Sequence, residues 1–255
     1  MKRITLAILC LTAFIHAPSA FSQRLNSDWY ACNINEGKTM EDLMVVAAAW
    51  DKWFDKNATT KYRAYILTPM LGNFVDHPEV IWMGFSPTPS DLGRTMDEWM
   101  SKGREMQAQF NEVVSCSSHA LQGVQVVRPY DRADEPSVVQ VSSCERKPGV
   151  SWGQVAMADN LWAEWMEKNG ITGGTQRWWS GPGSPRGRAA DPDMTEAEFQ
   201  QVWITGSMEE RGKAVEAYRA ADDAAGDVYS IFGDDSLYEC DTARVWYAQP
   251  VGGSE

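Results

Sequence analysis

The sequence has few basic residues and very little histidine, and both shortages restrict what the protein can do. Lys and Arg number 23 against 35 Asp and Glu, which gives a formal net charge of −12, and no local basic patch interrupts this excess. Such a chain repels polyphosphate, so a nucleic-acid-binding surface is not expected. The three His residues and the absence of a Cys-x-x-Cys pair leave few ligands for zinc or haem. We therefore expect no nucleic-acid partner, no metal site and no cofactor.

Long apolar runs are missing after the first twenty residues, and so is any familiar catalytic pattern. No later segment approaches the ~18 apolar residues that a membrane-spanning helix needs. No Ser/His/Asp set, phosphate-binding loop or carboxylate pair has a spacing typical of an active site. We expect a soluble protein without a membrane span, and these patterns leave open whether it is an enzyme.

The N-terminus has the three parts of a signal peptide. Lys2 and Arg3 precede an apolar run, residues 4–15, and small residues up to Ala20 follow. Cleavage after Ala20 or slightly later predicts that residues 1–22 are removed, which changes the formal charge from −12 to −14 by loss of the two cations. The mature protein is then exported, to the periplasm or outside the cell.

Cysteine is scarce but evenly numbered in the expected mature chain. The four that remain are Cys32, Cys116, Cys144 and Cys240. An even number in an exported chain is typical of two disulfides, and four cysteines allow three pairings. The count therefore predicts two disulfides without choosing the partners.

An internal repeat links the two halves of the chain. Cys32 and Cys144 are 112 residues apart. The same offset joins further identical residues: Gly37 with Gly149, Trp50 with Trp162, Trp53 with Trp165, and Asn57 with Asn169. We interpret this as a tandem duplication, because such matches without a gap are hard to attribute to chance. It predicts a first unit over residues 23–130, a linker over 131–137 and a second unit over 138–255.

Each unit has the pattern strand, helix, strand, strand, helix, strand. In the first unit, Thr39 and Asp42 resemble a capping box, and apolar residues at helical spacing follow over residues 40–57. The second unit has the standard capping box, Ser151 with Gln154. Two β-rich segments around a Gly, Asn and Pro loop predict a hairpin, and residues 90–114 predict a second helix. Two βαβ crossovers around a central hairpin give the ferredoxin-like topology.

Two such units in one chain resemble the dimeric α/β-barrel superfamily. Its members include antibiotic biosynthesis monooxygenases, muconolactone isomerases, and the haem-binding chlorite dismutases and dye-decolourising peroxidases. The resemblance implies an α+β fold, in which two ferredoxin-like units pack sheet to sheet as an intrachain pseudo-dimeric α/β barrel. It also implies a monomer, because the duplication supplies the dimer internally.

The same topology implies a choice of disulfides. The end of the first strand of each unit neighbours the start of the fourth strand, and the two run antiparallel. This places Cys32 beside Cys116 and Cys144 beside Cys240. We expect these two bridges, each within one unit.

Repeated aromatic and basic residues suggest a ligand site. Alternation along a strand places Arg63 with Tyr65 on one face, and Arg177 with Trp179 on one face. If those faces line the space between the units, guanidinium groups framed by rings would suit an anionic or aromatic ligand. The alternative is that these arginines stack on rings or pair with Asp and Glu. The candidate ligand-binding residues are Arg63, Tyr65, Trp82, Arg177, Trp179 and Trp203.

The remaining aromatic and histidine residues suit structural roles better. The helical pairs Trp50 with Trp53, and Trp162 with Trp165, are expected in the core, because each indole can face the sheet. His77 lies in the hairpin loop without a counterpart in the second unit, which makes it the one weak catalytic candidate.

Three functions remain open on this pattern. The first is binding of a small aromatic or anionic molecule between the two sheets. The second is a cofactor-independent monooxygenase or isomerase of the dimeric α/β-barrel type, with His77 as its base. The third is a protein-interaction scaffold without a pocket. Only the analogy of fold supports the enzyme, so the residues of the site must distinguish the three functions.

Overall fold

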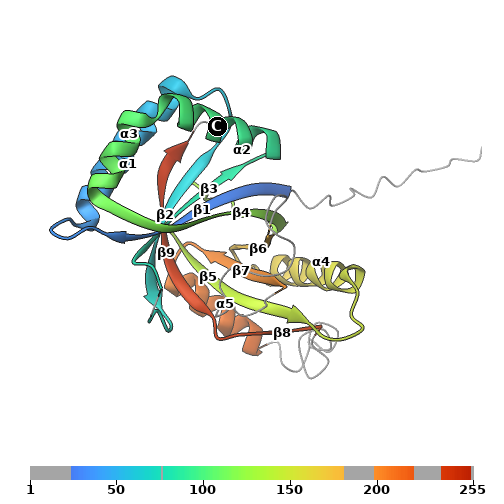
Figure 1. Ribbon diagram of the computed structural model, residues 1–255. Coiled ribbons are helices and arrows are strands. Elements are labelled where there is room, and N and C mark those ends of the chain that lie inside the picture. The colour runs from blue at the N-terminus through green and yellow to red at the C-terminus, as the bar shows by residue number, and fades with distance from the viewer. Residues whose placement is uncertain (1–23, 76, 181–197, 221–236, 254–255) are drawn as a thin grey trace, which may run out of the picture.

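The computed structural model describes residues 24–75, 77–180, 198–220 and 237–253 of the chain (Figure 1). The predicted signal peptide, residues 1–22, lies outside the described residues. The described segments form nine strands and five helices. In chain order these are β1 (Arg24–Ile34), α1 (Met40–Asn57), β2 (Arg63–Leu71), β3 (Val80–Ser86), α2 (Pro89–Lys102), α3 (Arg104–Val113), β4 (Val114–Arg128), β5 (Ser137–Arg146), α4 (Trp152–Lys168), β6 (Gly174–Ser180), β7 (Phe199–Thr205), α5 (Met208–Ala220), β8 (Tyr238–Cys240) and β9 (Arg244–Gly253).

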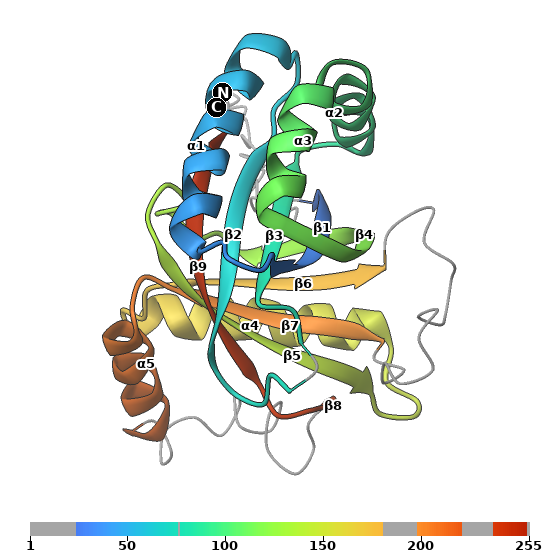
Figure 2. The same ribbon diagram turned by 60° about the vertical axis from the view of Figure 1, so that its left-hand side comes forward.

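Eight of these strands form one closed antiparallel barrel. Hydrogen bonds follow the order β7-β6-β4-β1-β3-β2-β9-β5, and β5 pairs with β7 to close the ring (Figure 2). The short β8 pairs with the last residues of β5, on the same side of that strand as β9. The mixed α/β fold expected from the sequence is confirmed. The two halves do not stack as separate sheets, because β2 pairs with β9 and β4 pairs with β6.

The strand order around the barrel occurs twice. The first half of the chain supplies β4-β1-β3-β2, and the second half supplies β9-β5-β7-β6. In both halves the first and last strands of the half are neighbours, and the hairpin between the helices lies next to them. The two junctions between halves join the second strand of one half to the last strand of the other.

Two helices begin at the capping boxes expected from the sequence. Before α1, Thr39 Oγ1 accepts the Asp42 N–H at 3.2 Å, and Asp42 Oδ2 accepts the Thr39 N–H at 2.8 Å. Ser151 and Gln154 make the same pair of bonds before α4, at 3.3 and 2.9 Å. These bonds satisfy N–H groups that the first helical turn leaves without partners, so the local sequence determines where both helices start.

The long helix predicted over residues 90–114 is two helices, α2 and α3, that meet at Gly103. A β-carbon on Gly103 would lie 2.5 Å from the carbonyl oxygen of Trp99 and 2.6 Å from its ring. The backbone therefore passes too close to Trp99 for any larger residue. The break lets α3 run beside α1, while α2 points away from them (Figures 1 and 2).

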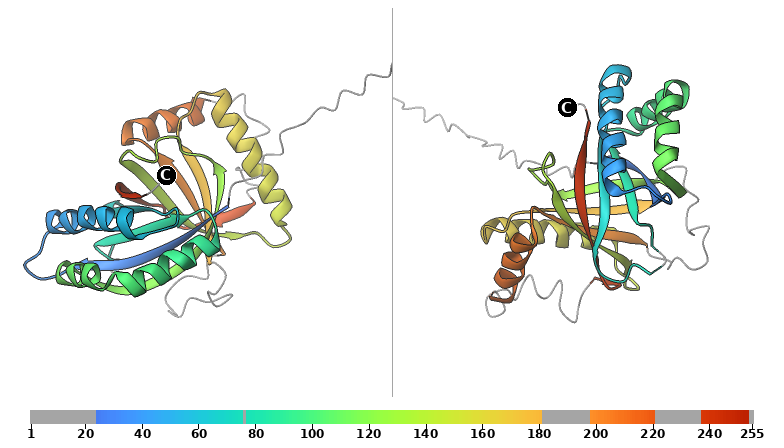
Figure 3. Two further views of the ribbon diagram at one scale, coloured as in Figure 1. Left: turned by 90° about the horizontal axis from the view of Figure 1, so that it is seen from above. Right: turned by 90° about the vertical axis from the view of Figure 1, so that its left-hand side faces the viewer.

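The barrel wall separates two kinds of core. Inside, alternate strand residues such as Leu67, Met83 and Val202 meet in the lumen. Outside, α1, α2 and α3 cover the first half through residues such as Phe54, and α4 and α5 lie over the second half around Met166. Figure 3 shows the strands between these two groups of helices. A residue's strand phase therefore decides whether it faces the lumen or a helix layer.

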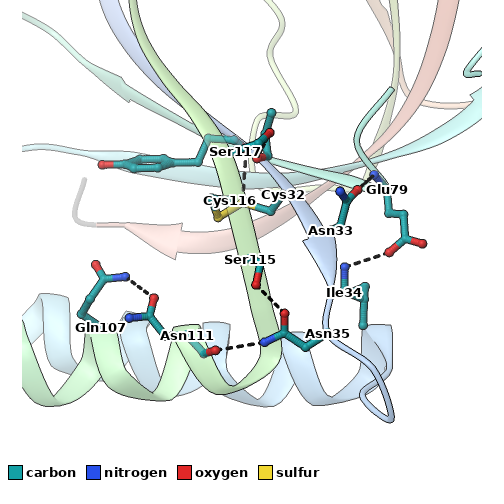
Figure 4. The surroundings of a disulfide bond; sticks show 12 residues. Cys32, Asn33, Ile34, Asn35, Glu79, Gln107, Asn111, Ser115, Cys116 and Ser117 are labelled. Atoms are coloured by element: carbon teal, nitrogen blue, oxygen red, sulfur yellow. Dashed lines mark hydrogen bonds between the residues drawn. A yellow bond between two sulfur atoms is a disulfide. The ribbon is translucent and has the colours of Figure 1, made fainter. Parts of the chain in front are cut away.

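The structure contains both disulfides that the resemblance implied. Cys32 of β1 and Cys116 of β4 are register partners with Cα atoms 3.9 Å apart (Figure 4). Cys144 of β5 and Cys240 of β8 are also register partners, with Cα atoms 4.1 Å apart. Each bond joins the first strand of a half to a late strand of the same half.

Candidate functional site

One end of the barrel lumen is hollow. A cavity of about 400 Å³ lies where β2, β5 and β6 begin and where β3, β4 and β7 end. We call it the lumen cavity. Its apolar wall includes Tyr65, Leu67, Met83, Phe85 and Trp178. This volume falls within the range of small-molecule sites, about 300–1,000 Å³, and a mostly apolar, aromatic wall is typical of them.

The segment between β4 and β5, residues 129–136, borders this end of the lumen, and we call it the connector. Arg63 Nη2 lies 3.0 Å from Asp134 Oδ1 of the connector. The Tyr65 hydroxyl donates to the Ala133 carbonyl at 3.1 Å. Burial raises the pKa of Tyr65, so this hydroxyl keeps its proton and remains a donor. Arg63 and Tyr65, two of the three β2 residues that line the cavity, are thus tied to the connector.

Two residues of the cavity wall carry hydroxyl groups without partners. Ser86 and Tyr130 both line the lumen cavity. Their hydroxyl oxygens are buried, and neither has a hydrogen-bond partner among the described residues. Leaving a buried polar group unpaired costs about 1–3 kcal/mol. The described part of the protein therefore leaves both hydroxyls unsatisfied beside the cavity.

Only two of the six predicted ligand residues reach this cavity, namely Arg63 and Tyr65. In β6 it is Gln176 and Trp178 that line the lumen, so by alternation Arg177 faces outward. The repeat suggested the opposite phase for β6. The repeat aligned Arg63 of β2 with Arg177 of β6. Shifting that alignment by one residue moves every β6 side chain to the other face, which explains why the prediction for Arg177 was wrong.

Arg177 makes the interaction that the alternative interpretation anticipated. Its Nη1 and Nη2 donate to the two carboxylate oxygens of Asp159 on α4, each at 2.7 Å. Arg177 is 1% exposed, and its guanidinium lies 4.8 Å from the ring centre of Phe199. This is a buried bidentate ion pair that fastens α4 to β6 rather than a group lining the lumen.

The other predicted aromatics also lie outside the lumen. Trp179 lies over Gly123 of β4, its register partner, on the outward face of β6. Trp203 packs with Trp165 under α4 and α5. Trp82 lies beneath α1 and α3. We therefore correct the prediction that these side chains share one cavity with Arg63, since alternation turns all of them toward the helices.

His77, the weak catalytic candidate, lies at the far end of β2 from the lumen cavity. Its ring contacts the Phe74 ring, with centroids 5.8 Å apart, and Phe74 in turn packs on Trp246. His77 is not among the described residues that line the lumen cavity. Nothing therefore connects His77 with the lumen cavity.

A second cavity, of about 110 Å³, lies between the first half of the sheet and α1–α3. We call it the aromatic cavity. Its wall includes Trp50, Trp53, Tyr62, Trp82 and Trp99, several of which meet edge to face. The helical pair Trp50 and Trp53, expected in the core, is therefore also part of a cavity wall.

A buried carboxylate enters the aromatic cavity. Asp28 is 3% exposed, and Tyr62 donates its hydroxyl proton to Asp28 Oδ1 at 2.9 Å. The Tyr62 oxygen accepts from Trp82 Nε1 at 3.2 Å. Burial, and then the charge of Asp28, raises the pKa of Tyr62 well above its ordinary value, so Tyr62 stays protonated. His119 Nε2 lies 3.8 Å from Asp28 Oδ2 and stacks on Tyr30.

Sequence reasoning missed Asp28 and Tyr62, although Gly84 marks their meeting point. Asp28 and Ala64 pair with Gly84 from its two sides. A β-carbon on Gly84 would lie 1.8 Å from the Tyr62 oxygen, so the phenol crosses β3 in the space that glycine leaves. A glycine inside a β pattern often signals such a close approach.

The described residues contain no group of three or more His, Cys, Asp or Glu that could hold a metal ion. Within the same part of the chain, no helix is long and apolar enough to cross a membrane.

Comparisons with known proteins show a shared fold at low identity. No protein-family model and no curated protein matches the chain. A solved structure from Lactobacillus acidophilus NCFM, provisionally named a monooxygenase, is 9% identical with a TM-score of 0.51, and the match covers 91% of this chain and 98% of that one. A protein provisionally named a chlorite dismutase is 12% identical with a TM-score of 0.49, covering 90% and 96%. One from Fusobacterium nucleatum subsp. nucleatum ATCC 25586, provisionally named a monooxygenase, is 8% identical with a TM-score of 0.49, covering 91% and 94%. The Lactobacillus match supports the dimeric α/β-barrel resemblance for the fold alone.

Proposed function

We propose that this protein binds a small aromatic or anionic molecule in the lumen of its barrel. The observation that carries the proposal is the lumen cavity itself, which has an aromatic wall, a guanidinium at its edge and two unpaired buried hydroxyls. A scaffold without a pocket would gain stability by filling this space, since interiors normally pack densely. The cavity therefore favours ligand binding over the scaffold hypothesis.

The proposal also covers the domain organisation, oligomeric state and cellular location of the protein. Two ferredoxin-like units, residues 23–130 and 138–255, joined by the linker 131–137, would form the barrel as an internal dimer and leave the chain monomeric. The repeated strand order and the equivalent disulfides support this. Disulfides persist in oxidising compartments, which supports export to the periplasm or beyond after loss of the signal peptide.

A lumen-filling substitution tests the binding proposal. Ala248 is 2% exposed and lines the lumen cavity. Protein purified from its own host should retain a small molecule in native mass spectrometry, and Ala248→Leu should abolish the retained mass while the fold persists. Ala48→Leu is the matched control, because Ala48 is exposed on α1 and lines neither the lumen cavity nor the cavity beneath α1, and it should keep the ligand. An Ala248→Leu protein that carries the same ligand would refute the lumen as the site.

A second candidate function, a cofactor-independent isomerase or monooxygenase, is favoured by Asp28 in the aromatic cavity. In an isomerisation, its carboxylate could take a proton from an enolisable carbon acid held among the indoles and return it at another carbon, which needs no oxidant, whereas a monooxygenation would also consume dioxygen. Tyr62 would hold the carboxylate in place, and His77 would have no part. Asp28→Asn should abolish such turnover. Tyr62→Phe should lower kcat and leave KM nearly unchanged, because it keeps the ring in the cavity wall and removes the bond that orients Asp28, together with the Trp82 bond to the phenol oxygen.

A further inference from the structure

The charged residues around the lumen cavity contrast with the charge of the whole molecule. Acidic residues outnumber basic ones 35 to 23 in the chain. Yet Lys61 and Arg63 both line the lumen cavity, and none of its described lining residues is Asp or Glu. A cavity whose charge is opposite to that of its surroundings attracts an anion and disfavours a cation.

Arg63 already has an anionic partner, but a replaceable one. The partner, Asp134, belongs to the connector, and its side chain is 76% exposed against 28% for Arg63. Ion pairs as exposed as this contribute little to stability. A guanidinium binds a carboxylate or sulfonate best through two parallel hydrogen bonds, and an acidic group in the cavity could make both of them with Arg63. An anion arriving through the cavity can therefore compete with Asp134 on favourable terms.

Beside Arg63 the wall of the cavity is aromatic. The ring centroids of Tyr65 and Phe85 are 5.8 Å apart, and those of Phe85 and Trp178 are 6.2 Å apart. All three residues line the lumen cavity. Rings at these spacings offer their faces and edges to another ring. The anionic end of a ligand and its aromatic body thus have separate, adjacent places.

We propose that the lumen cavity selects an aromatic monoanion, and that Asp134 is an internal competitor that occupies Arg63 until the ligand's acidic group replaces it. This inference rests on the proposed function, since it requires a ligand in the lumen. It adds the chemical class of the ligand, a carboxylate or sulfonate attached to a ring system. It also assigns the connector a part in recognition.

Two matched dyes test the inference on the disulfide-bonded protein. The anionic probe is 8-anilinonaphthalene-1-sulfonate, and the neutral probe is N-phenyl-1-naphthylamine, which has the same rings without the sulfonate. Fluorescence titration should show tighter binding of the sulfonate. Asp134→Asn should increase the affinity for the sulfonate by about two- to fivefold, because an exposed competing ion pair is lost. It should leave the affinity for the neutral dye unchanged. Arg63→Met should lower the affinity for the sulfonate by about tenfold or more and leave the affinity for the neutral dye unchanged.

Asp131→Asn is the matched control, because it removes one exposed carboxylate from the same connector without a described contact to Arg63. If it tightens the sulfonate as much as Asp134→Asn does, the effect is general charge and the competitor role is wrong. Equal binding of both dyes by wild type, Asp134→Asn and Arg63→Met would overturn the anion selection while leaving lumen binding intact.

Failure of the proposed function has a different signature. Ala248→Leu, with Val139→Phe as a second lumen-filling variant should the first not fold, must weaken both dyes. If neither dye binds wild type, or if filling the lumen changes neither affinity, the lumen is not the site and both proposals fall together.

Discussion

At the scale of single residues, Gly84 decides whether Tyr62 can reach Asp28. A β-carbon there would lie 1.8 Å from the Tyr62 oxygen, so Gly84→Ala must displace the phenol and leave the buried carboxylate without its donor. We expect a loss of about 2–4 kcal/mol in the free energy of unfolding, measured by urea denaturation. Gly93→Ala on α2 is the control, because no atom lies within 4 Å of its β-carbon position, and it should stabilise by up to ~1 kcal/mol. Equal midpoints for wild type and Gly84→Ala would contradict the crossing of Tyr62 over Gly84.

Residue-level inference from the sequence succeeded within strands and failed between them. Alternation correctly grouped Arg63 with Tyr65, since period-two geometry is local. Which face of β6 points inward depends on how that strand pairs with β4 and β7, and the repeat alone placed it one residue out of phase. Asp28 could not be found because a lone carboxylate in a strand is normally solvent-exposed, and only the folded barrel brings Tyr62 over it.

At the scale of elements, the Arg177–Asp159 pair fastens α4 to the barrel. Arg177→Met would leave Asp159 buried without a cation, and we expect a cost of about 3–5 kcal/mol in thermal or urea unfolding. Burial raises the pKa of Asp159, and loss of the Arg177 charge would raise it further, so the orphaned carboxyl would take up a proton more readily. The double variant Arg177→Met/Asp159→Leu should cost less than the single one, because it leaves no buried charge. A double variant as unstable as the single one would show that packing, and not the uncompensated charge, dominates.

The connector is held to α5 by Glu210, which makes that contact sensitive to acid. The Glu210 carboxylate accepts a hydrogen bond from Arg132 and another from the Gly206 N–H, and the first of these lowers its pKa below the ordinary 4.5. A lowered folded-state pKa contributes stability above the ordinary value, and the contribution is lost as pH falls through the folded value. The free energy of unfolding, measured with urea, should therefore be lower at pH 3.5–4 than at pH 7. The difference between the two pH values should be smaller in Glu210→Gln than in wild type. Glu216→Gln, an exposed change on the same helix, should leave the pH dependence as it is.

The start of an element was easier to predict than its continuity. Thr39 with Asp42 and Ser151 with Gln154 indicated two helix N-termini correctly, because capping depends on residues three positions apart. The division of α2 from α3 at Gly103 was not predicted, since the apolar stripe continues through it. That break follows from the approach of Gly103 to Trp99, a contact that periodicity does not report.

At the scale of the whole molecule, each disulfide joins the first strand of one half of the chain to a late strand of the same half. The bonded cysteines are 84 and 96 residues apart in sequence. Bridges over such long loops mainly restrict the unfolded chain, and removing a native one typically costs about 2–5 kcal/mol. Cys32→Ser/Cys116→Ser and Cys144→Ser/Cys240→Ser should each lower the unfolding midpoint. Reduction of wild type should reproduce the sum of the two losses, and a wild-type midpoint that is insensitive to dithiothreitol under unfolding conditions would count against these bridges.

The architecture was more accessible from the sequence than the site. Two rounds of strand, helix, strand, strand, helix, strand indicated a mixed α/β fold, because element order and short connections restrict the possible topologies, and the resemblance to the dimeric α/β barrels implied the barrel. The continuity of the barrel was not visible, since the pairings β2–β9 and β4–β6 join segments from opposite halves. The site depends on the same long-range pairings, which bring β2, β5 and β6 to one end of the lumen.

The two pairings that join the halves, β2–β9 and β4–β6, have a consequence for how the chain folds. The free edge of β4 waits for β6, and the free edge of β2 waits for β9, the last described strand, so a nascent first half keeps one bare strand edge until nearly the whole chain has emerged. Another copy can offer an identical β9 to such an edge, so exchange between chains competes with self-closure in proportion to protein concentration. Refolding should therefore return monomer in dilute solution and interlocked pairs when crowded, and the lumen will be among the last features to appear.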